Sequence, residues 1–116
     1  MYDGDTISVR WPIRRVLVTG PSMVPALRHG DHLLVRFGRM RTQAPGSVVV
    51  VDLPDRPRSV KRLVRVEPDG RIWVEGDNPA GSTDSRELGP LPAAALRGRV
   101  LIRLWPRPGS VPPRAD

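Results

Sequence analysis

Apolar residues recur along the chain in short runs, each bounded by glycine, proline or aspartate. Runs of this length that are rich in valine and leucine are typical of β-strands rather than helices. The run at residues 48–51 is valine at every position, which suits a strand buried on both faces. The pattern predicts six strands, at residues 15–19, 32–36, 47–52, 59–66, 71–75 and 98–104.

Turn signals indicate how these strands connect. A Pro-Asp-Gly sequence at residues 68–70 is a strong turn signal and predicts a hairpin between the fourth and fifth strands. Residues 91–97 carry a weak helical pattern, with Pro92 near its start and Gly98 at its end. We therefore predict a mostly β fold with little helix, built as a coiled antiparallel sheet or partial β-barrel.

The length of 116 residues suffices for one domain with a modest core. Residues 106–116 include four prolines and few apolar side chains, a composition typical of disordered segments. We predict a single domain over residues 1–105, followed by a proline-rich disordered tail over residues 106–116.

Composition excludes several classes of protein. The chain has no cysteine, so disulfide scaffolds and cysteine nucleophiles are excluded. No apolar run approaches the roughly 18 residues of a membrane span. The acidic N-terminus, residues 1–6, is not followed by the apolar region of a signal peptide. These features predict a cytoplasmic protein without a transmembrane segment.

The net charge of +7 raises nucleic acid as a partner. However, the arginines are scattered along the chain and there are few aromatic rings on which bases could stack. We interpret the arginines as a solvated surface and predict no nucleic-acid partner. His29 and His32 flank a turn without an obvious third ligand, so we predict neither a metal site nor a cofactor.

Ser22 is the first candidate for chemistry. It follows a short apolar run and a strand-breaking Gly20-Pro21 pair, and Pro25 prevents a regular helix from starting there. The hydroxyl of Ser22 is therefore expected on a stiff turn at the end of a strand. Such a serine is nucleophilic only with a base in reach, and a plain turn serine is the alternative.

Lys61 is the one lysine among the 19 basic residues. A lysine can lose its proton when it is buried, whereas arginine cannot, so a neutral lysine amine can act as the base for a serine. Its apolar neighbours Val60 and Leu63 suit a buried strand. The alternative is a solvent-facing lysine beside Arg62.

A polar, glycine-rich stretch at residues 76–86 lies between two predicted strands. Ser82 could hydrogen-bond the lysine amine there, and Asp84 with Arg86 could form a supporting ion pair. A plain surface loop is the alternative.

Taken in order, four stretches resemble the sequence blocks of the type I signal peptidase family. They extend over residues 19–100 and read Gly-Pro-Ser-Met-Val-Pro-Ala-Leu, Gly-Asp-His-Leu-Leu-Val, Val-Lys-Arg-Leu-Val and Gly-Asp-Asn-Pro-Ala-Gly-Ser-Thr-Asp-Ser-Arg-Glu-Leu-Gly. The resemblance implies a mostly β serine endopeptidase with a Ser/Lys dyad.

The resemblance also assigns roles to single residues. Ser22 matches the family nucleophile, Lys61 the general base, and Ser82 the serine that positions the lysine amine. Asp84 and Arg86 match a structural pair.

Two further residues of the serine block bear on the resemblance. Met23 completes the Ser-Met motif, and the backbone N–H of Ser22 would donate to the developing oxyanion. Gly20 stands where some relatives carry a serine that donates a second hydrogen bond, and glycine has no side chain to do so.

The chain lacks the membrane anchor and the large insertion of some relatives. In this it is similar to the short, soluble branch of nickel-type superoxide dismutase maturation proteases, whose expected role is to remove the N-terminal extension of that enzyme's precursor. The expected partner is thus a precursor protein, with nickel-type superoxide dismutase as the named candidate.

Three alternatives remain open from the sequence. The first is signal peptidase I-like processing of secretory precursors at the membrane, and the second is a non-enzymatic peptide-binding relative, against which the intact Ser22, Lys61 and Ser82 count. The third is the self-cleaving domain of an SOS-type repressor, for which the residues before Thr19 leave no room for a DNA-binding module.

Overall fold

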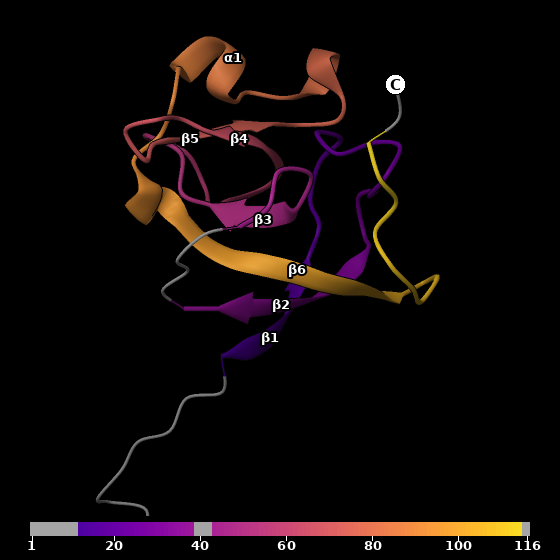
Figure 1. Cartoon of the computed structure of the whole chain (residues 1–116). Helices are drawn as coiled ribbons and strands as arrows, with labels where there is room; N and C mark the ends of the chain where they lie inside the picture. Colours follow the sequence, from indigo (N-terminus) through magenta and orange to yellow (C-terminus); the bar gives the residue numbers. More distant parts are fainter. Residues whose placement is uncertain (1–11, 39–42, 115–116) are drawn as a thin grey trace, which may run out of the picture.

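Six strands form one antiparallel sheet in the computed structural model, which describes residues 12–38 and 43–114 (Figure 1). The order across the sheet is β1-β2-β6-β3-β4-β5, and the sheet does not close on itself. The strands are β1 (Ile13–Leu17), β2 (His32–Phe37), β3 (Val48–Val51), β4 (Ser59–Val66), β5 (Ile72–Glu75) and β6 (Leu96–Trp105). The predicted mostly β fold with an antiparallel sheet is confirmed.

The predicted strand positions agree with the observed ones to within two residues. The largest differences are two residues: β1 is Ile13–Leu17 rather than 15–19, and β6 begins at Leu96 rather than at residue 98. Val18 still exchanges backbone hydrogen bonds with Gly30 and Asp31 beyond the last ladder pair, so the chain is tied to β2 where it enters the Ser22 turn. The predicted hairpin pairs β4 with β5.

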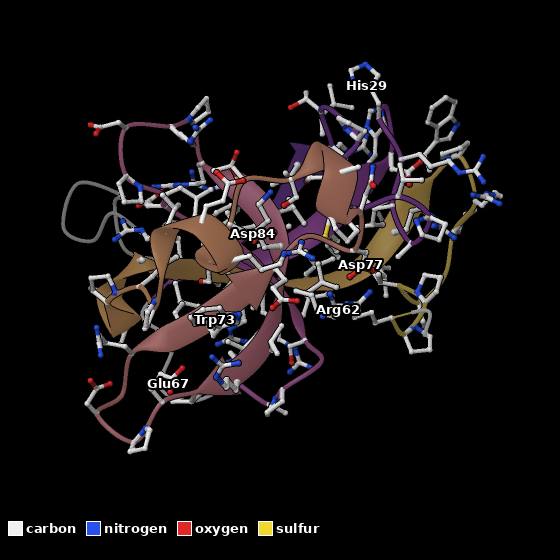
Figure 2. The ribbon with its side chains drawn as sticks, turned by 90° about the horizontal axis from the view of Figure 1, so that it is seen from above. His29, Arg62, Glu67, Trp73, Asp77 and Asp84 are labelled. Atoms are coloured by element: carbon white, nitrogen blue, oxygen red, sulfur yellow. The ribbon has the colours of Figure 1, made fainter. Side chains whose placement is uncertain are left out.

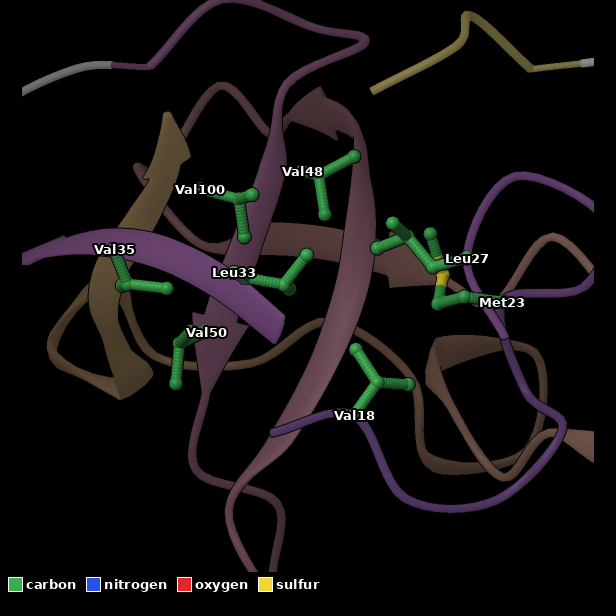
Figure 3. Packing of buried hydrophobic residues seen from close by; sticks show 8 residues of the cluster. All are labelled: Val18, Met23, Leu27, Leu33, Val35, Val48, Val50 and Val100. Carbon is green, nitrogen blue, oxygen red and sulfur yellow. The ribbon is translucent and has the colours of Figure 1, made fainter. Parts of the chain in front are cut away.

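β3 lies in the middle of the sheet, between β6 and β4, and both of its faces are buried. Val48 and Val50 belong to one hydrophobic cluster, and Val49 and Val51 belong to a second. Figure 3 shows the first cluster, in which Met23 and Leu27 of the Ser22 turn pack near Val18. The second cluster contains Leu63 of β4 and reaches Ile72 and Val74 of β5. The two cores therefore meet at one strand.

Short helical segments lie between β5 and β6, namely η1 (Pro79–Gly81), α1 (Ser85–Leu88) and η2 (Ala93–Ala95). The single turn η2 falls within the predicted helical stretch. α1 begins in the predicted polar loop, residues 76–86, and extends two residues beyond it. Asp84 caps it by accepting a hydrogen bond from the Arg86 backbone N–H at 3.0 Å.

The segment after β6 turns back along the domain toward β4 and β5 (Figure 1). Gly109 and Arg103 exchange two backbone hydrogen bonds, and Val111 packs against the first core. The Pro112 carbonyl accepts a hydrogen bond from Arg62, and Arg114 pairs with Glu75 at 2.8 Å. These contacts are made by residues 109–114 of the predicted proline-rich tail, a segment that has little apolar surface of its own.

No helix in residues 12–38 and 43–114 is long and apolar enough to cross a membrane. The acidic residues 1–6 lie outside the described part of the chain.

Candidate active site

Buried apolar side chains and a backbone hydrogen bond fix the Ser22 turn, residues 19–27. Met23 and Leu27 are buried in the first core, which fixes the chain on either side of the bend. Gly20 adopts a φ of +81°, a conformation that favours glycine, and its N–H donates to Nδ1 of His29 at 3.1 Å. Ser22 is half-buried between these supports.

A second segment, residues 76–78 after β5, fastens the same turn from the other side. The Asn78 backbone N–H donates to the Ser22 carbonyl at 2.9 Å, and its side-chain amide donates to the Pro21 carbonyl at 3.1 Å. Gly76 lies so close that a Cβ there would sit 2.5 Å from the Ser22 carbonyl oxygen. Glycine at position 76 is thus required by space, and the two segments meet at backbone contact.

Lys61 projects from the middle of β4 and is only 4% exposed. Its amine donates a hydrogen bond to the Ser82 hydroxyl at 3.0 Å. Burial lowers the pKa of Lys61 below that of an ordinary lysine. The charge of Asp84 opposes this shift, and the charges of Arg86 and Arg56 add to it. The amine is therefore easier to deprotonate than a lysine in water.

A chain of hydrogen bonds continues behind Lys61. Ser82 accepts from the lysine and donates its own hydrogen to Asp84 Oδ2 at 2.6 Å. Asp84 is fully buried and also accepts from the Gly76 N–H and from the Arg86 guanidinium, at 2.8 and 2.7 Å. The direction of these bonds fixes the Ser82 oxygen as an acceptor toward Lys61, which orients the amine.

Asp84 stays ionised in this setting. Burial by itself raises the pKa of Asp84, but hydrogen bonds from Arg86, Ser82 and the Gly76 backbone outweigh burial and hold that pKa well below its usual range. Arg86 also donates to the Gly76 carbonyl at 2.8 Å, so it secures both the carboxylate and the end of β5.

A groove of about 430 Å³ brings the two candidate catalytic residues to one surface. Ser22 and Lys61 both line it, together with residues 16–19 and the segment 56–60 before and within β4. Among the described residues, no hydrogen bond joins the Ser22 hydroxyl to the Lys61 amine, which donates to Ser82 instead. Such bonds are often long in a peptidase without substrate and tighten when one binds.

Comparison with known sequences decides the family. A sequence model of the Peptidase S24-like family matches residues 12–100. The chain belongs to this family. Mitochondrial inner membrane protease subunit 1 of Xenopus tropicalis is 36% identical, over 78% of this chain and 68% of that protein. Mitochondrial ATP-independent inner membrane protease subunit 1a of Arabidopsis thaliana is 34% identical, over 86% of this chain and 75% of that protein. Mitochondrial inner membrane protease subunit 2 of Schizosaccharomyces pombe is 28% identical, over 77% of this chain and 63% of that protein.

These relatives agree with a signal-peptidase-like, S24-type peptidase fold and correct two finer expectations. The predicted cytoplasmic location is wrong, because the curated relatives are named as inner membrane proteases. Their names also give no support to maturation of nickel-type superoxide dismutase. The resemblance to the soluble maturation proteases rested on chain size, on an expected absence of an anchor and on the Gly-Pro-Ser-Met-Val-Pro sequence, and none of these identifies a substrate.

The S24-like site also contains residues that sequence reasoning did not single out. Arg62, named in the sequence analysis only as the neighbour of Lys61, is buried and pairs with Asp77 at 2.6 Å (Figure 2). Asn78 and Gly76 bind the Ser22 turn, as described above, and His29 supports Gly20. The Gly-Asp-Asn sequence directly after a strand was the signal for Gly76, Asp77 and Asn78, although only the fold shows what each one touches.

Proposed function

We propose that this protein is a serine endopeptidase that processes precursor proteins at a membrane, with Ser22 as nucleophile and Lys61 as general base. The observation that carries the proposal is the hydrogen-bonded chain from Arg86 through Asp84 and Ser82 to a buried lysine that shares a groove with Ser22. A buried amine of lowered pKa, oriented by a fixed acceptor, is what a lysine needs to act as a base near neutral pH.

The chemistry follows from this arrangement. The Ser22 hydroxyl attacks the scissile carbonyl carbon while the Lys61 amine takes the hydroxyl proton. The oxyanion that forms accepts a hydrogen bond from the Ser22 backbone N–H. Collapse breaks the C–N bond, and protonated Lys61 returns the proton to the leaving amine. A water molecule, deprotonated by Lys61, then attacks the acyl carbonyl carbon. The C–O bond to Ser22 breaks, and protonated Lys61 returns the proton to the Ser22 oxygen.

An extended substrate fits beside this dyad. β1 is an edge strand of the sheet, and residues 16–19 at its end line the groove next to Ser22. An unpaired strand edge can bind a peptide through main-chain hydrogen bonds, as an added strand. Such binding would place a peptide bond across the Ser22 hydroxyl without demanding a specific side chain at every position.

The membrane part of the proposal is supported by the names of the relatives, which are inner membrane proteases. It is tested by cell fractionation. We expect the full-length protein to sediment with membranes at physiological salt and to be released by carbonate or detergent. Recovery entirely in the soluble fraction would contradict a membrane site of action.

The peptidase part is tested with chromosomal variants of the natural gene. We expect Ser22→Ala and Lys61→Ala cells to accumulate proteins that keep an N-terminal extension, detected by mass spectrometry of protein N-termini in the membrane and soluble fractions. Lys61→Arg should behave in the same way, because a guanidinium keeps its charge but cannot take a proton.

The matched control is Ser47→Ala, which removes a serine at the start of β3 outside the groove. Its N-termini should equal those of the wild type. Unchanged N-termini in the Ser22→Ala cells would reject Ser22 as nucleophile. Stable peptide binding without cleavage would instead identify a peptide-binding subunit.

A further inference from the structure

The groove carries positive charge and no carboxylate. Its lining includes three basic side chains, Arg56, Arg58 and Lys61, and neither aspartate nor glutamate. The rest of the wall is largely apolar, with Val16, Leu17, Val18, Met23, Phe37, Val50, Leu53 and Val60 among its residues. A peptide lying there meets an apolar surface with cations on one side.

Two of the three cations already have partners within the fold. Lys61 donates to Ser82, and Arg58 pairs with Asp52 at 2.8 Å. Arg56 is exposed on the loop between β3 and β4 and has no hydrogen bond or ion pair within residues 12–38 and 43–114. It is therefore the groove cation whose charge remains available to a bound molecule.

Arg56 lines the same groove as Ser22 and Lys61, and the loop that carries it has a defined backbone turn. Asp55, directly before it, adopts a φ of +54°, which is uncommon for a residue other than glycine and marks a defined turn. The Arg56 charge also lowers the pKa of Lys61, in keeping with the groove that both side chains line. An anion paired with Arg56 would therefore lie in the groove that also holds the Ser22 hydroxyl and the Lys61 amine.

We propose that Arg56 determines specificity by pairing with an acidic side chain of the extended substrate, close to the scissile bond. This inference rests on the proposed peptidase function, and it names the substrate class as precursor segments that carry aspartate or glutamate near the cut. An exposed guanidinium–carboxylate pair is worth up to about 1 kcal/mol, which corresponds to roughly a fivefold preference.

The test measures peptide binding to the Ser22→Ala protein, in which cleavage is absent. The probes are fluorescein-labelled ten-residue peptides of alanine and valine with a single aspartate moved along the sequence, each paired with an otherwise identical asparagine peptide. By fluorescence anisotropy, we expect about fivefold tighter binding of the aspartate peptide at one or two adjacent positions. A ratio near one at every position would overturn the proposal.

Variants then locate the effect. Arg56→Gln should abolish the preference for aspartate, and Arg56→Glu should favour a lysine peptide at the same position. The matched control is Arg99→Glu, which makes the same change of charge at an exposed arginine of β6 that does not line the groove. The control should retain the preference. A preference that survives Arg56→Gln, or that Arg99→Glu also removes, would show that general positive charge is responsible.

The same peptides, incubated with the protein that has Ser22 intact and analysed by mass spectrometry, separate this proposal from the proposed function. Cleavage without any preference for aspartate would reject the role of Arg56 and keep the peptidase. Arg56-dependent binding without cleavage would reject the peptidase and keep the pairing.

Discussion

At the scale of the residue, the site depends on a lysine that is buried and still hydrogen-bonded. Its amine donates one hydrogen bond to Ser82. The other bonding positions on the nitrogen, including the lone pair of the neutral amine, are available to groups in the groove. Burial disfavours the ammonium form, and this is what makes the amine available as a base.

The pH dependence of activity should report this lysine. The base works only when neutral, so kcat/KM should rise with pH through the pKa of Lys61, with a midpoint below the ordinary lysine value of 10.5. Arg56→Gln should move the midpoint to higher pH, because it removes a charge that lowers this pKa. Initial rates on one cleaved peptide across the pH range provide the measurement. A midpoint at or above 10.5 would contradict the assignment of Lys61 as the general base.

Gly76 offers a second prediction at this scale. A Cβ at position 76 would sit 2.5 Å from the Ser22 carbonyl oxygen and would also collide with Ser82. Gly76→Ala should therefore push the nucleophile turn and the lysine support apart, reducing kcat roughly a hundredfold. Unfolding should become easier by about 2 kcal/mol.

The control for Gly76→Ala is Gly70→Ala. Gly70 has a φ of +90° in an exposed turn, and nothing lies within 4 Å of a Cβ there. Alanine at position 70 should cost stability through its backbone conformation and leave kcat unchanged. Equal losses of activity in the two variants would mean that Gly76→Ala acts through stability alone. Thermal unfolding and peptide kinetics together make the comparison.

At the scale of the element, the segment after β5 connects the two halves of the site. Asp77 faces Arg62 of β4, whereas Asn78 faces the Ser22 turn, so neighbouring residues link β4 and the turn to one short stretch of chain. Arg62 adds bonds to the Gly46 and Pro112 carbonyls, which extends the link to β3 and to the C-terminal segment.

Breaking the Arg62–Asp77 pair tests this element. Both side chains are almost completely buried, at 4% and 2% exposed. Asp77→Asn would leave the guanidinium buried without a counter-charge, and we expect a loss of about 3 kcal/mol in the free energy of unfolding. Chemical denaturation of the purified protein measures this free energy. The control is Asp69→Asn, which breaks the exposed pair of Asp69 with Arg71 and should cost less than a third as much. A similar cost in both variants would contradict the importance of burial.

The sequence predicted the strands well and the short helix poorly, for physical reasons. Runs such as the valines of β3 combine β-branched side chains with burial, and this signal survives in a single sequence. α1 is four residues long and has no apolar stripe, so it depends on its Asp84 cap rather than on periodicity.

Prediction of the site had a similar limit. Ser22, Lys61 and the residues from Ser82 to Arg86 stand in recognisable blocks, and the structure brings Lys61, Ser82, Asp84 and Arg86 into one bonded chain. The contacts of Gly76 and Asn78 with the Ser22 turn arise from how β5 ends against another segment. No local pattern in the sequence encodes that approach.

At the scale of the whole molecule, acid should destabilise the fold through Asp84. Its pKa is lowered in the folded state, so its contribution to stability is present above the ordinary aspartate value of 3.8 and is lost as pH falls through the lower folded-state value. The free energy of unfolding, measured by urea titration at several pH values, should decline in this acidic range. Asp84→Asn should show a shallower decline, and parallel curves for variant and wild type would exclude Asp84 as a contributor.

The central position of β3 has a consequence for how the protein opens. Its alternate valines belong to two cores, one of which anchors the Ser22 turn while the other contains Leu63, two residues from Lys61. If either core separated from β3, it would expose apolar side chains of a strand that also forms part of the other core. The amide hydrogens of β3 should therefore exchange with solvent only when the whole sheet unfolds. Nucleophile and base would be lost together in a single cooperative event, so partially open molecules that retain half of the groove should not accumulate.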